Sequence, residues 1–168
     1  MDEKLREAFA ELSRGRLEAL AEVWNALARP MHNYAFALTG SQEEADDIVS
    51  EVMVRLAGRG WRLKAVREPK SYLFAAVRNE ARTKAKRRKW VVEEVDDPPV
   101  EGVDEADAAV REAVMGLPVE QREVVVLHVW GGLTFEEVGR TVGVPTNTAA
   151  SRYRYALEKL RTAMSDER

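Results

Sequence analysis

Apolar residues recur every three or four positions through the first half of the chain, which is the spacing of one face of an α-helix. The first series predicts a long helix whose apolar face is Leu17, Leu20, Trp24, Leu27, Met31, Tyr34 and Leu38. Pro30 lies inside this series, where its missing backbone N–H predicts a kink, and Gly40 is suited to the helix end. The pattern therefore predicts one long, kinked amphipathic helix that ends at Gly40.

Two further helices are predicted before residue 90. The sequence Ser41-Gln42-Glu43-Glu44 is a capping box, and the helix that it opens would turn inward Ala45, Ile48, Val49, Val52, Met53 and Leu56. Its opposite side is acidic. A loop over residues 58–67 follows, and Pro69 suits the first turn of a third helix. That helix would bury Tyr72, Leu73, Ala76 and Val77 and then run into a basic stretch.

The C-terminal part has the spacing of a helix-turn-helix. Helices are predicted over residues 106–115 and 118–130, the second stopped by Gly131-Gly132. Thr134-Phe135-Glu136-Glu137 is another capping box, Gly143-Val144-Pro145 is a tight turn, and a longer helix starts at Thr146. The residues expected to share a core between the last two helices are Phe135, Val138, Val142, Ala149, Tyr153, Ala156, Leu157 and Leu160.

The fold class expected from these elements is all-α, with two small helical domains. They would occupy residues 1–90 and 106–168, joined by an acidic flexible linker over residues 91–105 that contains Pro98, Pro99 and Gly102. The formal net charge of −3 hides a strong local contrast. Residues 78–89 hold seven basic side chains against the single acid Glu80, whereas residues 93–107 hold only acidic charges.

Composition excludes several classes of protein. The chain has no cysteine, which removes disulfides, thiolate metal sites and cysteine nucleophiles and agrees with a reducing cytoplasm. Its first residues lack the apolar segment of a signal peptide, and no stretch approaches the ~18 apolar residues of a membrane span. We therefore expect an intracellular protein with no insertion into a membrane.

The helix from Thr146 carries the residue types that contact bases. At about 100° per residue, Thr148, Arg152, Tyr155 and Lys159 share one exposed side. Asn147, Ser151 and Arg154 flank them. Hydrogen-bond donors near the start of a recognition helix reach base edges in the major groove. The alternative is a solvated face on an ordinary helical hairpin.

The basic stretch points to nucleic acid as well. On a helix Arg78, Arg82, Lys86 and Lys89 approach one line, and Arg87 and Arg88 widen it, so several phosphates would be neutralised. The nearby aromatic residues Trp61, Tyr72, Phe74 and Trp90 are candidates for stacking on unpaired bases. For Tyr72 and Phe74 a core position is an equal alternative.

No catalytic, metal or cofactor site is expected. His128 lies in the apolar run of residues 124–130, which predicts a hydrogen-bonded core histidine. Asp46 and Asp47 are adjacent on a helix and diverge by about 100°, which is unsuited to sharing a proton or a metal. We therefore expect a binding protein and not an enzyme.

Two blocks of these residues resemble bacterial sigma-70 factors of the small extracytoplasmic-function (ECF) group. Residues 45–52 and 72–79, with the basic run, resemble sigma region 2. Residues 117–124 and 134–139, then Gly143-Val144-Pro145, Ser151-Arg152 and residues 157–161, resemble region 4. The match covers about residues 17–164, and nothing resembling region 3 lies between the blocks.

This resemblance implies a protein that binds core RNA polymerase and directs it to promoters. Asp46, Asp47 and Glu51 of this chain would bind the clamp helices of the beta-prime subunit of core polymerase. The flap of the beta subunit would be a second contact. The −10 DNA would meet Trp61, Arg78, Asn79, Arg82, Lys86, Arg87 and Arg88, and the loop over residues 58–67 would receive a flipped base. The −35 DNA would meet Asn147, Thr148, Ser151, Arg152, Arg154, Tyr155 and Lys159. An anti-sigma factor is a further candidate partner.

Several residues depart from the family pattern. These departures affect which promoter sequence is expected to be recognised more than they affect the resemblance to the family. Ser50 stands where Gln is usual, Thr83 where Asp is frequent and Tyr155 where Arg is frequent, and Asn147, Ala149 and Ala150 replace Gly, Val and Lys. Two alternative functions remain at this point. One is a stand-alone helix-turn-helix regulator on a duplex operator. The other is a helical interaction protein that has lost contact with DNA.

Overall fold

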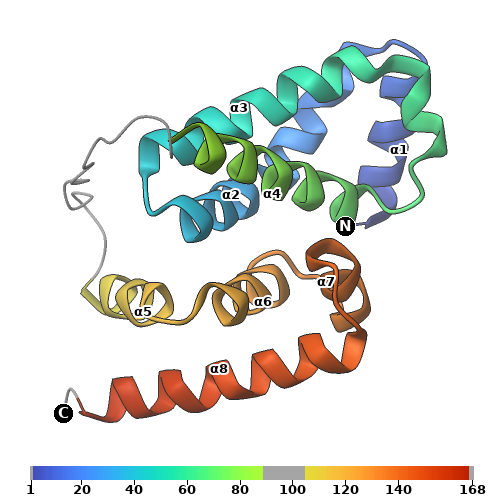
Figure 1. Ribbon diagram of the computed structural model, residues 1–168. Helices are drawn as coiled ribbons and strands as arrows, with labels where there is room; N and C mark the ends of the chain where they lie inside the picture. Colours follow the sequence, from blue (N-terminus) through green and yellow to red (C-terminus); the bar gives the residue numbers. More distant parts are fainter. Residues whose placement is uncertain (1, 89–104, 167–168) are drawn as a thin grey trace.

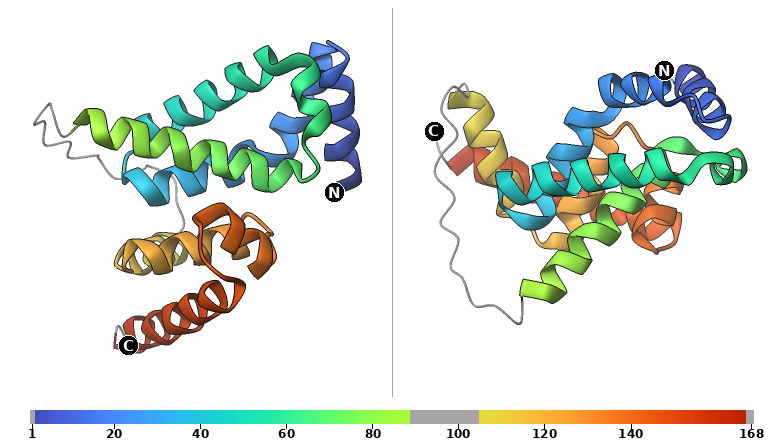
Figure 2. Two further views of the ribbon diagram at one scale, coloured as in Figure 1. Left: turned by 45° about the vertical axis from the view of Figure 1, so that its right-hand side comes forward. Right: turned by 90° about the horizontal axis from the view of Figure 1, so that it is seen from above.

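The computed structural model describes residues 2–88 and 105–166, and all of its regular elements are helices (Figure 1). The expected all-α fold class is confirmed. The linker predicted over residues 91–105, together with Lys89 and Trp90, lies almost wholly outside the described residues. Helices α1–α4 form one group, the N-terminal module, and α5–α8 form a second group, the C-terminal module, which lies beside it (Figures 1 and 2).

The N-terminal module packs three long helices around one core. They are α2 (Leu20–Thr39), α3 (Gln42–Arg59) and α4 (Pro69–Arg88). The short 3-10 helices η1 (Leu17–Ala19) and η2 (Gly60–Ala65) precede α2 and follow α3. Ser41 Oγ accepts a hydrogen bond of 3.2 Å from the Glu44 backbone N–H, which confirms the serine half of the predicted cap. The predicted inward face of α3 is buried, with Met53 half-buried.

The first helix, α1 (Asp2–Ser13), was not predicted from the sequence. Its buried residues Leu5, Ala8, Phe9 and Leu12 have helical spacing and pack into the same core. The predicted start of the long helix is also wrong, because the chain turns at Gly15 (φ 83°) and residues 17–19 form η1. Leu17 and Trp24 are about half exposed, at 52% and 48%, and the buried face of α2 instead includes Val23.

The C-terminal module consists of α5 (Glu105–Met115), α6 (Val119–Val129), α7 (Phe135–Val142) and α8 (Thr146–Asp166). Both halves of the capping box at the start of α7 are present: Thr134 Oγ1 accepts from the Glu137 N–H at 3.2 Å, and Glu137 Oε2 accepts from the Thr134 N–H at 2.7 Å. Leu157, expected to face the core, is 38% exposed, so that expectation is wrong; the inward face of α8 passes through Ala149, Tyr153, Ala156 and Leu160.

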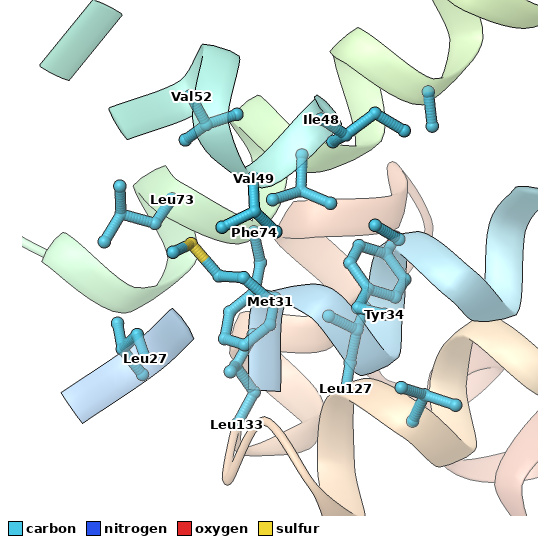
Figure 3. Close-up of a cluster of buried hydrophobic side chains, with 14 of the residues drawn as sticks. Leu27, Met31, Tyr34, Ile48, Val49, Val52, Leu73, Phe74, Leu127 and Leu133 are labelled. Atoms are coloured by element: carbon cyan, nitrogen blue, oxygen red, sulfur yellow. The ribbon is translucent and has the colours of Figure 1, made fainter. Parts of the chain in front are cut away.

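The two modules share a hydrophobic core. One continuous cluster includes Tyr34 and Phe74 from the N-terminal module and Leu127 and Leu133 from the C-terminal module. Figure 3 shows these four side chains together between the helices. The contact is close, since a Cβ added at Gly131 would lie 3.1 Å from Phe74 Cζ. Helices α6 and α7 therefore face α2 and α4, and α8 lies on the far side of the C-terminal module (Figure 1).

Candidate nucleic-acid interface

The recognition helix α8 starts after a tight turn. Gly143 has a left-handed backbone (φ 78°), and its N–H and that of Val144 both donate to the carbonyl of Gly139, at 2.8 and 2.9 Å. The carbonyl of Pro145 accepts hydrogen bonds from the backbone N–H groups of Thr148 and Ala149. These bonds close the end of α7 and start α8 within three residues. The local chemistry of the sequence thus forms the helix-turn-helix that its spacing predicts.

The predicted base-contacting side chains of α8 face two directions. Asn147, Arg154, Tyr155 and Lys159 are exposed, whereas Thr148, Ser151 and Arg152 are partly buried. Arg152 lines a cleft between the modules together with Arg78 and Arg82 of α4. Tyr155 and Lys159 border a shallow depression beside Gln121 of α6. The structure therefore brings Arg152 to the basic helix of the other module and leaves Asn147, Arg154, Tyr155 and Lys159 exposed to solvent.

The basic helix α4 presents most of its predicted set to solvent. Asn79, Arg82, Lys86 and Arg87 are exposed, and the side chain of Arg88 lies outside the described residues. Trp61 on η2 is 75% exposed, with the Arg62 guanidinium 6.0 Å from its ring. Phe74 is fully buried against Tyr34, and Tyr72 packs edge-on against Phe9. The core alternative is therefore the observed one for Phe74 and Tyr72, and neither ring is free to stack on a base.

Arg78 differs from its basic neighbours. Its Nε donates to Glu123 Oε1 of α6 at 2.6 Å, and its Nη2 donates to Oε2 at 3.3 Å. Tyr34 donates its hydroxyl hydrogen to the same Oε1 at 2.8 Å. Burial, followed by the nearby Glu123 carboxylate, raises the pKa of Tyr34 well above 10, so the phenol stays a neutral donor. The bond to Glu123 raises the pKa of Arg78, so the guanidinium stays charged.

The acidic side of α3 is exposed as predicted. The side chains of Asp46, Asp47 and Glu51 are 75%, 63% and 47% exposed. Each also has a basic neighbour: His32 Nε2 is 3.2 Å from Asp46, Lys84 Nζ is 3.6 Å from Asp47, and Arg55 Nε is 3.2 Å from Glu51. Arg55 Nη1 further pairs with the buried carboxylate of Glu80 at 2.6 Å, which fastens α3 to α4.

Comparison with known families decides the identity. The Sigma-70 region 2 family matches residues 23–91, which include α2–α4, and the Sigma-70 region 4 family matches residues 107–160, which include the helix-turn-helix. Together the two matches cover most of the chain, in the order expected from the sequence. The chain belongs to the sigma-70 family. It is an ECF-type sigma factor, which directs transcription initiation and is not an enzyme.

Several curated relatives of this sigma factor are similar over most of their length. The ECF RNA polymerase sigma factor SigL of Mycobacterium tuberculosis is 27% identical over 154 residues, covering 83% of this chain and 85% of SigL. The ECF RNA polymerase sigma factor EcfG of Rhodopseudomonas palustris is 27% identical over 135 residues, covering 76% of this chain and 75% of EcfG.

Two solved structures share the fold. The sigma factor RpoE of Bartonella quintana, in complex with the anti-sigma factor NepR, has a TM-score of 0.73 at 20% identity, and covers 88% of this chain and 98% of its own. CnrH, in complex with the cytosolic domain of CnrY, has a TM-score of 0.72 at 18% identity and covers 98% of this chain and 99% of its own. At these identities the likeness concerns the fold alone.

The histidine that the sequence offered as a candidate chemical group has a structural role in the sigma factor. His128 is half-buried; its Nδ1 lies 2.7 Å from the Leu133 carbonyl and its ring stacks on Phe135, as predicted for a core histidine. Within residues 2–88 and 105–166, no cluster of His, Asp and Glu is arranged to hold a metal ion. No helix in those same ranges is long and apolar enough to cross a membrane.

The polar residues that join the modules are not predicted by the sequence patterns described above. Besides Glu123, Arg122 of α6 donates to the Ala37 carbonyl at the end of α2 at 2.8 Å and to the carbonyls of Met115 and Leu117. Burial lowers the pKa of this guanidinium. A signal was present, because Glu123 falls one turn before the buried Leu127 on the same face of α6. A charge on the apolar side of a helix indicates a buried polar partner.

Proposed function

We propose that the N-terminal module binds core RNA polymerase and −10 DNA, and that the C-terminal module reads −35 DNA. The observation that carries this assignment is the contrast between the exposed acids on α3 and the exposed bases on α4. A carboxylate face suits a basic protein surface, whereas a basic helix suits phosphates. Helix α8 of the C-terminal module presents exposed side chains that can donate hydrogen bonds to base edges.

The proposed partners follow from these surfaces. Asp46, Asp47 and Glu51 would contact the clamp helices of the beta-prime subunit, and the C-terminal module would contact the flap of the beta subunit. Promoter DNA would be the second partner, and the protein would act in the bacterial cytoplasm. An anti-sigma factor would be a third partner, a proposal supported by the complex of the similar RpoE with NepR. The residue roles and the domain limits of 1–90, 91–105 and 106–168 are part of the same proposal.

Charge reversal on α3 tests polymerase binding. Asp47→Arg is expected to weaken binding to core RNA polymerase at least tenfold, because one favourable charge contact is replaced by a repulsive one. Asp47 is exposed, so helicity and melting temperature should change little. The matched control is Glu7→Arg, an exposed acid of α1 outside the matched region 2. Binding is measured by titrating labelled sigma factor with core enzyme, and equal affinity of Asp47→Arg and wild type would refute the docking face.

Truncation of one arginine tests DNA reading. Arg152→Ala is expected to reduce transcription from −35-dependent promoters. The free energy that discriminates the −35 sequence from other sequences should fall by roughly 1–3 kcal/mol, the range for a good base contact. Arg161→Ala, an exposed residue near the other end of the same helix, is the control. The measurement is reconstituted transcription with core enzyme and a genomic promoter library. The assignment of Arg152 is wrong if the promoter profile of the variant equals that of wild type.

A further inference from the structure

The guanidinium of Arg78 is occupied by the other module. Its bonds of 2.6 and 3.3 Å to Glu123 form a two-pronged ion pair, and the two side chains are only 14% and 5% exposed. Every other described basic residue of the predicted −10 set is exposed. Arginine binds a carboxylate and a phosphate with the same planar fork, so the Glu123 carboxylate stands in the place that a phosphate would take.

The surroundings of this ion pair hold the modules together. Tyr34 adds a third hydrogen bond to Glu123 from inside the N-terminal module. Lys70 Nζ reaches the Gly132 carbonyl at 3.4 Å, and Phe74 contacts the loop that contains Gly131. Arg82 and Arg152 line the same cleft as Arg78 and Glu123. DNA can therefore reach the Arg78 guanidinium only if the C-terminal module, which contacts α4 through Glu123 and through α7, moves away from α4.

We propose that Arg78, Glu123 and Tyr34 form a latch that keeps the free sigma factor closed and shields Arg78 from DNA. The inference rests on the proposed role of α4 in binding promoter DNA. A DNA phosphate can replace the Glu123 carboxylate at Arg78, so opening on the promoter exchanges one charge-assisted contact for another. A free protein has no such replacement, and the buried ion pair keeps it closed.

Distances between spin labels report the closed and open states directly. Because the chain has no cysteine, Ala21→Cys in α2 and Thr162→Cys in α8, both exposed positions, receive labels at these two sites alone. Wild type is expected to give one narrow distance distribution. Glu123→Gln should broaden it towards longer distances, and Glu123→Lys, which repels Arg78, should do so more strongly. Glu136→Gln removes an exposed acid of α7 and should match wild type.

Binding rates test whether the latch controls access. Glu123→Gln is expected to associate with a promoter DNA fragment that contains the −10 element roughly tenfold faster than Glu136→Gln, because Arg78 is already accessible in a larger fraction of the molecules. Tyr34→Phe keeps the net charge and the ring packing and should shift both readouts part of the way. It also keeps the test decisive if Glu123→Lys melts early.

The outcomes separate the latch from the proposed function. Distances unchanged in Glu123→Gln, Glu123→Lys and Tyr34→Phe would overturn the latch whatever polymerase does. Longer distances with an unchanged association rate would overturn its role in access. Failure of wild type to bind core polymerase would contradict the proposed function, while the label distances would still decide whether the ion pair holds the modules closed.

Discussion

Replacing Arg122 by Met is expected to lower the free energy of unfolding by about 2–4 kcal/mol. The guanidinium gives hydrogen bonds to three carbonyls, those of Ala37, Met115 and Leu117. Two of these belong to the last turns of α2 and α5, where carbonyls lack partners within the helix and a cation is favourable. Met fills similar space but donates no hydrogen bond, so these buried acceptors lose their partner. The measurement is equilibrium unfolding in urea followed by circular dichroism.

Two further variants make the Arg122 experiment specific. Arg140→Met removes a guanidinium that is 56% exposed on α7 and should change stability by less than about 0.5 kcal/mol. Arg122→Lys keeps the charge but offers one ammonium group instead of a fork, so it should fall between wild type and Arg122→Met. Equal stability of Arg122→Met and Arg140→Met would show that the carbonyl contacts contribute nothing.

Replacing Gly139 by Ala is expected to destabilise the helix-turn-helix by about 1–3 kcal/mol, although Ala is the better helix former. Gly139 lies inside α7, and a Cβ there would be 2.7 Å from the Val144 carbonyl and 3.4 Å from the Thr146 N–H nitrogen. Both neighbours are backbone atoms of the turn, so the turn itself must move. The start of α8 moves with it, and reconstituted transcription from −35-dependent promoters should fall as well.

Gly58→Ala is the matched control for Gly139→Ala. Gly58 also lies in a helix, α3, but a Cβ there would meet nothing within 4 Å. The same substitution should therefore be neutral or stabilise the protein by roughly 0.5–1 kcal/mol. Thermal unfolding of both variants gives the comparison. A stabilised Gly139→Ala would mean that α7 and the turn are not as closely packed as the structure has them.

Local chemistry explains what could be predicted from the sequence. The capping box at Thr134, the left-handed glycines at positions 40 and 143 and the inward face of α3 depend on residues within one or two turns of each other. The prediction of a helix-turn-helix therefore followed from the capping and turn residues together with the helical spacing. Helix α1 has the same periodic signal in Leu5, Ala8, Phe9 and Leu12, so the sequence contains the information that predicts it.

Contacts between distant segments explain what could not be predicted. The partners of Glu123 lie 89 and 45 positions away in the chain, and Arg122 reaches a carbonyl 85 positions away. Periodicity shows that a residue faces inward, but it does not show which element it meets. For this reason Arg78 was predicted with the DNA-facing residues, and its burial against α6 was found only in the structure. The roles of Arg152 and its neighbours stay predictions.

The exposed carboxylates of α3 form ion pairs with basic side chains of α3 and α4. Asp47 neighbours Lys84 of α4, and Glu51 neighbours Arg55, which also binds the buried Glu80 of α4. A basic protein surface that docks on Asp47 and Glu51 competes with Lys84 and Arg55 for the same oxygens. The positive potential around α4 then rises when the acidic face is covered. Binding of core polymerase to the sigma factor would thus strengthen its binding to promoter DNA, and binding of promoter DNA would strengthen its binding to core polymerase. This reciprocal free-energy coupling would depend on the two ion pairs of Asp47 and Glu51.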